Sequence, residues 1–102
     1  MKIKPLYKAV VCADGFSMSV QASTTAYSKP RTDSGPYTEV EIGFPNEEEP
    51  LLLSYAEEPE ELTNTVYPYV PVERVSLVLA KHGGVVSGEL PEGVPMLKSE
   101  YE

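Results

Sequence analysis

An Asp-Gly dipeptide near the start of the chain constrains the fold more than any other feature of the sequence. Asp14-Gly15 separates two runs of alternating apolar and polar residues, 6–13 and 16–22. A two-residue type I′ turn needs positive φ at both central positions, and Asp-Gly suits it. With that turn Ala13 faces Phe16, and one face of the hairpin collects Tyr7, Ala9, Val11, Ala13, Phe16, Met18, Val20 and Ala22. We therefore predict an N-terminal hairpin whose register is fixed by this segregation.

The middle of the chain predicts a loop and two further strands. Residues 23–36 are polar and rich in Ser, Thr and Pro, which is typical of a long loop, ordered or not. Residues 37–44 alternate like a half-exposed strand, with one face formed by Thr38, Val40, Ile42 and Phe44. Residues 65–70 are β-prone, but Pro68 cannot donate to a ladder, so this segment is at best an edge strand.

Residues 71–82 are the best helix candidate. Apolar residues recur there at helical spacing, Pro71 suits the first turn, and Gly83 suits the position after the last turn. Three valines lower the helix propensity, and the alternation from Val75 to Leu79 also fits a strand, so both structures stay open. Residues 85–87 can return as a short strand.

Together these elements predict one α+β domain. The chain has 102 residues, too few for two domains of usual size. We expect a three- or four-stranded, mainly antiparallel sheet over residues 1–90, with one helix covering the apolar face of the hairpin through Val75, Val78 and Leu79. Residues 91–102 contain two prolines and four charged residues and predict a poorly ordered tail.

Charge is distributed unevenly along the chain. The net charge is −8, yet residues 32–73 contain eleven acidic residues and no Lys or Arg. Such a segment repels nucleic acid and anionic membranes and favours basic partners, although solubility alone also explains many charge runs. The single Cys12 excludes an internal disulfide and suits a reducing cytoplasm, and no apolar run predicts a signal peptide or a membrane span.

Catalytic and metal-binding chemistry is not predicted. Cys12 and His82 are the only residues of their types, and one Cys with one His cannot form a structural zinc site. The acidic runs lack the spacing of a calcium loop, and the glycines after His82 lack the Lys of a phosphate loop. We expect no enzyme activity, no metal and no cofactor, although folding could bring Asp14, Asp33 or Glu73 near His82.

Three stretches of the sequence carry a resemblance. Residues 11–22, 35–45 and 69–75 resemble parts of small uncharacterised bacteriophage proteins. The resemblance carries over no functional residue and no fold. It implies a setting, which is a phage accessory protein in the cytoplasm of an infected bacterium or a minor component of a virion.

The combined expectation is a non-catalytic protein that binds and inhibits a host or defence factor with a basic surface. Tyrosine is enriched at binding surfaces, and the expected contact residues are Glu47, Glu48, Glu49, Tyr55, Glu57, Glu58, Tyr67 and Tyr69. One alternative is a binder or sponge for a small anionic ligand such as a nucleotide, as a single chain or as an oligomer, with Lys29 and Arg31 as the contacts. The other alternative is a minor structural or assembly protein that pairs through an exposed edge strand.

Overall fold

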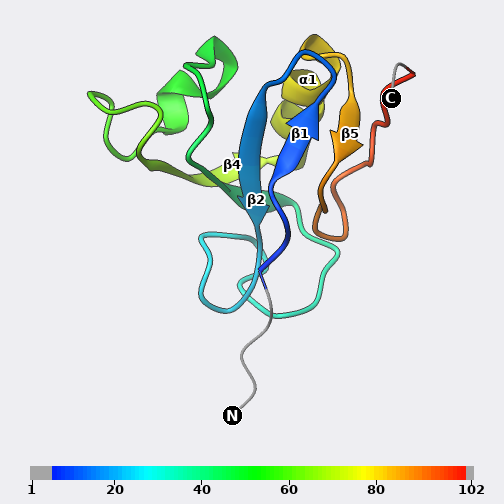
Figure 1. Ribbon diagram of the computed structural model, residues 1–102. Coiled ribbons are helices and arrows are strands. Elements are labelled where there is room, and N and C mark those ends of the chain that lie inside the picture. The colour runs from blue at the N-terminus through cyan, green and yellow to red at the C-terminus, as the bar shows by residue number, and fades with distance from the viewer. Residues whose placement is uncertain (1–5, 101–102) are drawn as a thin grey trace.

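The chain forms one five-stranded antiparallel sheet with a main helix on one face (Figure 1). The structure is a computed structural model and describes residues 6–100. The strand order is β4-β3-β2-β1-β5. The elements along the chain are β1 (Val10–Cys12), β2 (Ser17–Gln21), β3 (Glu39–Gly43), the 3-10 helix η1 (Pro50–Tyr55), β4 (Val66–Pro71), α1 (Val72–Lys81) and β5 (Val85–Ser87). The predicted α+β class, hairpin and covering helix are confirmed, and the sheet has more strands than expected.

The hairpin is present, but its predicted register is wrong by one residue. Val10 pairs with Met18, and the Cys12 N–H donates to the Phe16 carbonyl at 2.8 Å. The connection is therefore a three-residue loop in which only Gly15 needs a positive φ, which is 93°. The Phe16 N–H, left over by this loop, donates to Asp14 Oδ1 at 2.9 Å.

With this register, the face of β1 that was predicted to be exposed lies in the core. Val10 and Cys12 are buried, Val11 and Tyr7 are half-buried, and Ala9 and Ala13 are exposed. On β2 the predicted face is correct, since the core contains Phe16, Met18, Val20 and Ala22. A three-residue loop is compatible with this register because it needs a single left-handed residue, Gly15.

The register can be tested on two neighbouring valines. Val10→Ala removes two methyl groups from a fully buried site, and we expect it to lower the free energy of unfolding by about 2 kcal/mol. Val11→Ala, on the outer face, is expected to cost less than about 1 kcal/mol. Urea unfolding measures both changes, and the opposite ranking would restore the two-residue turn.

The third strand ends differently from the expectation. Val40 and Ile42 are buried as predicted, but Phe44 is 56% exposed and Tyr37 is buried. Phe44 has a φ of 49°, a conformation that bulky residues rarely adopt, and its N–H donates to the Thr65 carbonyl. The backbone therefore leaves the pleat after Gly43, and the Phe44 side chain turns away from the core.

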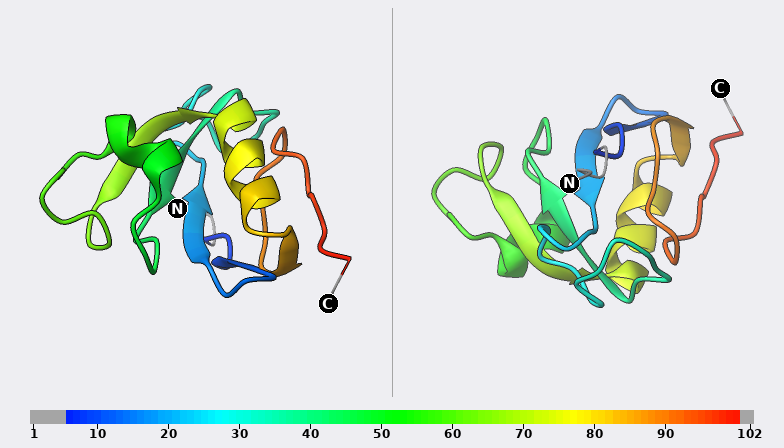
Figure 2. Two further views of the ribbon diagram at one scale, coloured as in Figure 1. Left: turned by 90° about the horizontal axis from the view of Figure 1, so that it is seen from above. Right: turned by 90° about the horizontal axis from the view of Figure 1, so that it is seen from below.

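The helix and η1 lie on the same face of the sheet. Figure 2 shows α1 following directly from β4 and crossing the sheet, with η1 beside it. The helical interpretation of residues 71–82 is confirmed, and its expected core residues Val75, Val78 and Leu79 are fully buried. Leu52 of η1 completes this core from the β4 side.

Other parts of the chain cover some of the outer edge of both terminal strands of the sheet. Beside β4, which is an edge strand as predicted, the Val66 carbonyl accepts the Glu57 N–H and the Tyr69 N–H donates to the Tyr27 carbonyl. Beside β5, the Val85 N–H donates to the Leu97 carbonyl and its carbonyl accepts the Ser99 N–H. Residues 97–99, part of the tail expected to be poorly ordered, therefore lie beside β5, while residues 1–5 and 101–102 lie outside the described residues.

Candidate functional site

A histidine held between two carboxylates lies where three segments of the chain meet. His82 follows α1, and its Nε2 lies 2.6 Å from Glu49 Oε1 while its Nδ1 lies 2.6 Å from Asp14 Oδ2. The imidazole stacks on Phe16 with ring centroids 4.1 Å apart and is only 7% exposed. The contact joins the hairpin turn, the start of η1 and the end of α1.

Glu49 is the buried member of this network. Its side chain is 1% exposed and accepts the Leu51 N–H at 2.7 Å, which caps η1. Lys81 Nζ donates to the same carboxylate at 3.0 Å. A buried carboxylate is stable only when it is paired and hydrogen-bonded, and here Glu49 has both kinds of partner.

The charges of the network stabilise one another. Burial alone would lower the pKa of His82, but the hydrogen bonds and charges of Asp14 and Glu49 raise it above its ordinary value. Burial alone would raise the pKa of Glu49, but the hydrogen bonds from Leu51, His82 and Lys81 lower it. The Phe16 N–H and then His82 lower the pKa of Asp14. Both ring nitrogens of His82 therefore lie against a carboxylate inside the network.

The network makes stability depend on pH in a defined direction. The raised pKa of His82 stabilises the fold fully below its unfolded value of about 6.5, and this contribution is lost as pH rises through the folded pKa. The lowered pKa values of Glu49 and Asp14 contribute above their unfolded values and are lost as pH falls through the folded ones. We therefore expect stability to be highest between the unfolded carboxyl pKa values of about 4 and the unfolded imidazole pKa of about 6.5, and to decline as the pH rises above about 6.5.

Urea unfolding in buffer with a chelator measures this profile. His82 is the only histidine in the chain, so no second imidazole titrates in that interval. The variant His82→Gln is expected to lose the decline above about pH 6.5, whatever its overall stability. A midpoint that stays constant or rises between about pH 6 and pH 8.5 in the original protein would contradict the assignment.

A third carboxylate lies on the solvent side of the network. Asp14, Glu47 and His82 each offer a ligand atom, and these atoms all lie within 4.8 Å of one another. Asp14 and Glu47 are exposed, whereas His82 is buried. Of the expected neighbours of His82, the structure thus brings Asp14 to it, and it adds Glu47 and Glu49.

Cys12 lies on the buried face of β1 and is 2% exposed. Burial, with a contribution from the Asp14 charge, raises the pKa of its thiol to about 11. The thiol is therefore protonated at neutral pH, which is the unreactive form of cysteine.

The expected partner-binding residues divide into two groups. Glu47, Glu48, Glu57 and Glu58 are exposed, Tyr55 is half-buried, and Tyr69 is 37% exposed. Glu49 and Tyr67 are buried and cannot contact a partner. Glu49 is held inside by its ion pairs, and Tyr67 by its place in the core, from which its hydroxyl donates to the Leu62 carbonyl.

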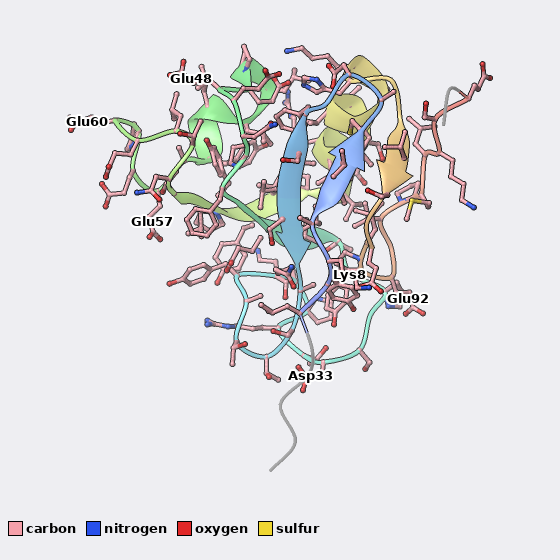
Figure 3. The ribbon with its side chains drawn as sticks, in the orientation of Figure 1. Lys8, Asp33, Glu48, Glu57, Glu60 and Glu92 are labelled. Atoms are coloured by element: carbon pink, nitrogen blue, oxygen red, sulfur yellow. The ribbon has the colours of Figure 1, made fainter. Side chains whose placement is uncertain are left out.

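Exposed glutamates gather around η1 and the loop before β4. We call this surface the acidic edge, formed by Glu47, Glu48, Glu57, Glu58, Glu60 and Glu61. Figure 3 shows Glu48, Glu57 and Glu60 projecting from the same side of the molecule, while Asp33 and Glu92 lie elsewhere. Half-buried Tyr55 and exposed Leu53 of η1 lie between the two acidic segments in the sequence.

The two expected anion-binding residues lie over tyrosine rings. Lys29 Nζ is 5.8 Å from the centre of the Tyr69 ring, and the Arg31 guanidinium is 5.3 Å from that of Tyr27. The two rings are 5.7 Å apart and tilted. Lys29 also faces Glu39 at 3.8 Å, which offsets part of its charge.

A small open pocket of about 180 Å³ lies elsewhere, between β5 and the C-terminal segment. Its lining residues include Val86, Met96 and Lys98. Pockets for drug-sized ligands usually measure about 300–1,000 Å³, so this hollow offers little room.

Comparison with protein-family models, with curated proteins and with solved structures finds no significant match. In the part of the chain that the structure describes, no helix is both long and apolar enough to span a membrane.

Proposed function

We propose that this chain is a non-catalytic binding protein that occupies and inhibits a basic surface of a host or defence protein through the acidic edge. The setting, an infected bacterial cytoplasm, rests on the resemblance of three sequence stretches to bacteriophage proteins. The observation that carries the proposal is that Glu48, Glu57 and Glu60 project from one side of the fold, with the exposed Glu47, Glu58 and Glu61 as their neighbours in the sequence. Within residues 6–100, none of the six forms an ion pair with a Lys, Arg or His side chain.

Hydrogen bonds fix the backbone that carries the acidic edge. This favours a role of these glutamates in recognition over a role in solubility alone. The Glu57 N–H donates to the Val66 carbonyl, and the Glu58 N–H donates to Thr65 Oγ1. The Glu61 N–H donates to the Glu58 carbonyl, which closes a turn inside the loop. On the other flank, buried Glu49 anchors the segment that contains Glu47 and Glu48. A preorganised array of charges loses little entropy when it binds.

The charge pattern selects the kind of partner. Clustered carboxylates repel phosphates and accelerate association with a basic protein. A protein that binds nucleic acid presents such a basic surface, and the acidic edge would then stand where phosphates bind. Leu53, which is 45% exposed, adds an apolar contact beside the charges.

Capture from a bacterial lysate with matched variants tests the proposal. The edge variant replaces Glu48, Glu57 and Glu60 with Gln, and the control variant replaces the exposed Glu73, Glu92 and Glu100 with Gln. Both lose three negative charges, but only the first loses them from the acidic edge. We expect mass spectrometry to find a protein retained by the original chain and by the control and lost from the edge variant. Equal capture by all three proteins would rule the mechanism out.

A small-ligand function is the second candidate, favoured by the two cations that lie over Tyr27 and Tyr69. Tyrosine rings can stack on a base while Lys29 and Arg31 bind phosphate. A nucleotide at 100 times its Kd would stabilise the fold by about 2.7 kcal/mol. Thermal unfolding with a panel of nucleotides is the test, and the absence of any shift removes this candidate.

An assembly function through strand pairing has less support. The Val66 carbonyl and the Tyr69 N–H of β4 bond to loops, Pro68 has no N–H, and residues 97–99 pair beside β5. Edges covered in this way leave few backbone groups for a second chain.

A further inference from the structure

We propose that Asp14, Glu47 and His82 form a binding site for a divalent transition metal such as Zn²⁺. The site shares Glu47 with the acidic edge but does not rest on the role of that edge as a docking surface. Their ligand atoms lie within 4.8 Å of one another, and they come from the hairpin turn, the segment before η1 and the end of α1. The topology thus brings together three metal-ligating side chains that are distant in the sequence.

Glu49 gives His82 the orientation of a metal ligand. A metal-binding histidine generally donates its second N–H to a carboxylate, which fixes the tautomer and the direction of the ring. Glu49 Oε1 accepts from Nε2 at 2.6 Å and is itself held by Lys81 and the Leu51 N–H. The stack on Phe16 fixes the plane of the ring. Nδ1 is therefore the nitrogen directed towards the two remaining carboxylates.

The exposed carboxylates complete the site. Asp14 Oδ2 already lies 2.6 Å from Nδ1, and Glu47 has no hydrogen bond or ion pair through its carboxylate among the described residues. On binding, the metal replaces the Nδ1 proton, which leaves to the buffer, and the hydrogen bond between Asp14 and His82 is exchanged for two metal–ligand bonds. Water from the open side supplies the remaining ligands.

The ligand set selects the metal. One imidazole nitrogen with two carboxylates suits Zn²⁺, which takes His nitrogen and Asp or Glu oxygen at about 2.0–2.2 Å. Mg²⁺ and Ca²⁺ prefer sites built from oxygen alone. We therefore expect Zn²⁺ to bind and Mg²⁺ and Ca²⁺ to bind far more weakly.

Titration calorimetry on the chelator-treated protein tests the site, with Zn²⁺ as the probe. The informative variant is Glu47→Gln, because Glu47 takes no part in the buried network and the variant keeps the fold. Its matched control is Glu48→Gln, the exposed neighbour. We expect one Zn²⁺ per chain, a Kd raised at least about tenfold in Glu47→Gln, and an unchanged Kd in Glu48→Gln.

Nitrogen NMR of His82, the single histidine, distinguishes a metal bound by the imidazole from cations that are attracted by the exposed carboxylates alone. With Zn²⁺ we expect the Nδ1 resonance to move to the metal-bound range while Nε2 keeps its proton on Glu49. The proposal is overturned if no stoichiometric binding occurs, if the two variants bind alike, or if the Nδ1 resonance does not move. Failure here leaves the lysate capture experiment unaffected, so the two proposals fail separately.

Discussion

Glu49→Ala is expected to lower the free energy of unfolding by about 3–5 kcal/mol, because it leaves His82 and Lys81 without the carboxylate between them. The substitution also removes the cap of η1, whose Leu51 N–H loses its acceptor. Folded domains are stable by only about 5–15 kcal/mol, so this loss is a large share of the total. Urea unfolding at about pH 6, where the imidazole is charged, measures it.

The control for this variant is its neighbour in the chain. Glu48→Ala removes an exposed glutamate side chain, and its expected effect is within about 0.5 kcal/mol. Similar effects of the two substitutions would mean that Glu49 is not buried and that the network does not exist as described.

Phe16→Ala has the second large expected effect, again about 3–5 kcal/mol. Phe16 is 1% exposed, and its ring covers one face of the imidazole at 4.1 Å. Truncation therefore opens a cavity in the core and lets water reach the buried charges.

The second phenylalanine of the chain is the control for Phe16. Phe44 is 56% exposed, and Phe44→Ala is expected to change the free energy of unfolding by no more than about 0.5 kcal/mol. Thermal or urea unfolding compares the two. A larger loss at Phe44 than at Phe16 would contradict the way in which β3 ends.

The sequence predicts the elements well where local patterns decide them. The helix of residues 71–82 follows from apolar spacing, and the hairpin follows from the Gly15 turn. The predicted register was wrong because Asp14-Gly15 suits a two-residue turn and a three-residue loop alike. Both connections place apolar residues of β1 on the face that meets the core. The two registers differ in which pair of β1 residues enters the core, Val10 with Cys12 or Ala9 with Val11. Which pair fits there depends on the packing of α1 against the hairpin.

The charge network could not be read from local spacing. Asp14 and Glu49 lie 68 and 33 residues from His82, so only the fold brings them together. One signal was present, since Glu49 directly precedes Pro50 and an apolar run, which is a position for a helix cap. The sequence instead placed Glu49 among the solvated acids, and its burial is what separates it from Glu47 and Glu48.

The association rate with a captured basic partner, measured against salt concentration, tests the central claim most directly. We expect the rate constant of the original chain and of the Glu73, Glu92 and Glu100 control to fall steeply as salt rises. The variant of Glu48, Glu57 and Glu60 is expected to associate more slowly at low salt and to depend less on salt, because the steering charges are gone. If that variant associates as fast as the control at every salt concentration, the acidic edge is not the binding surface.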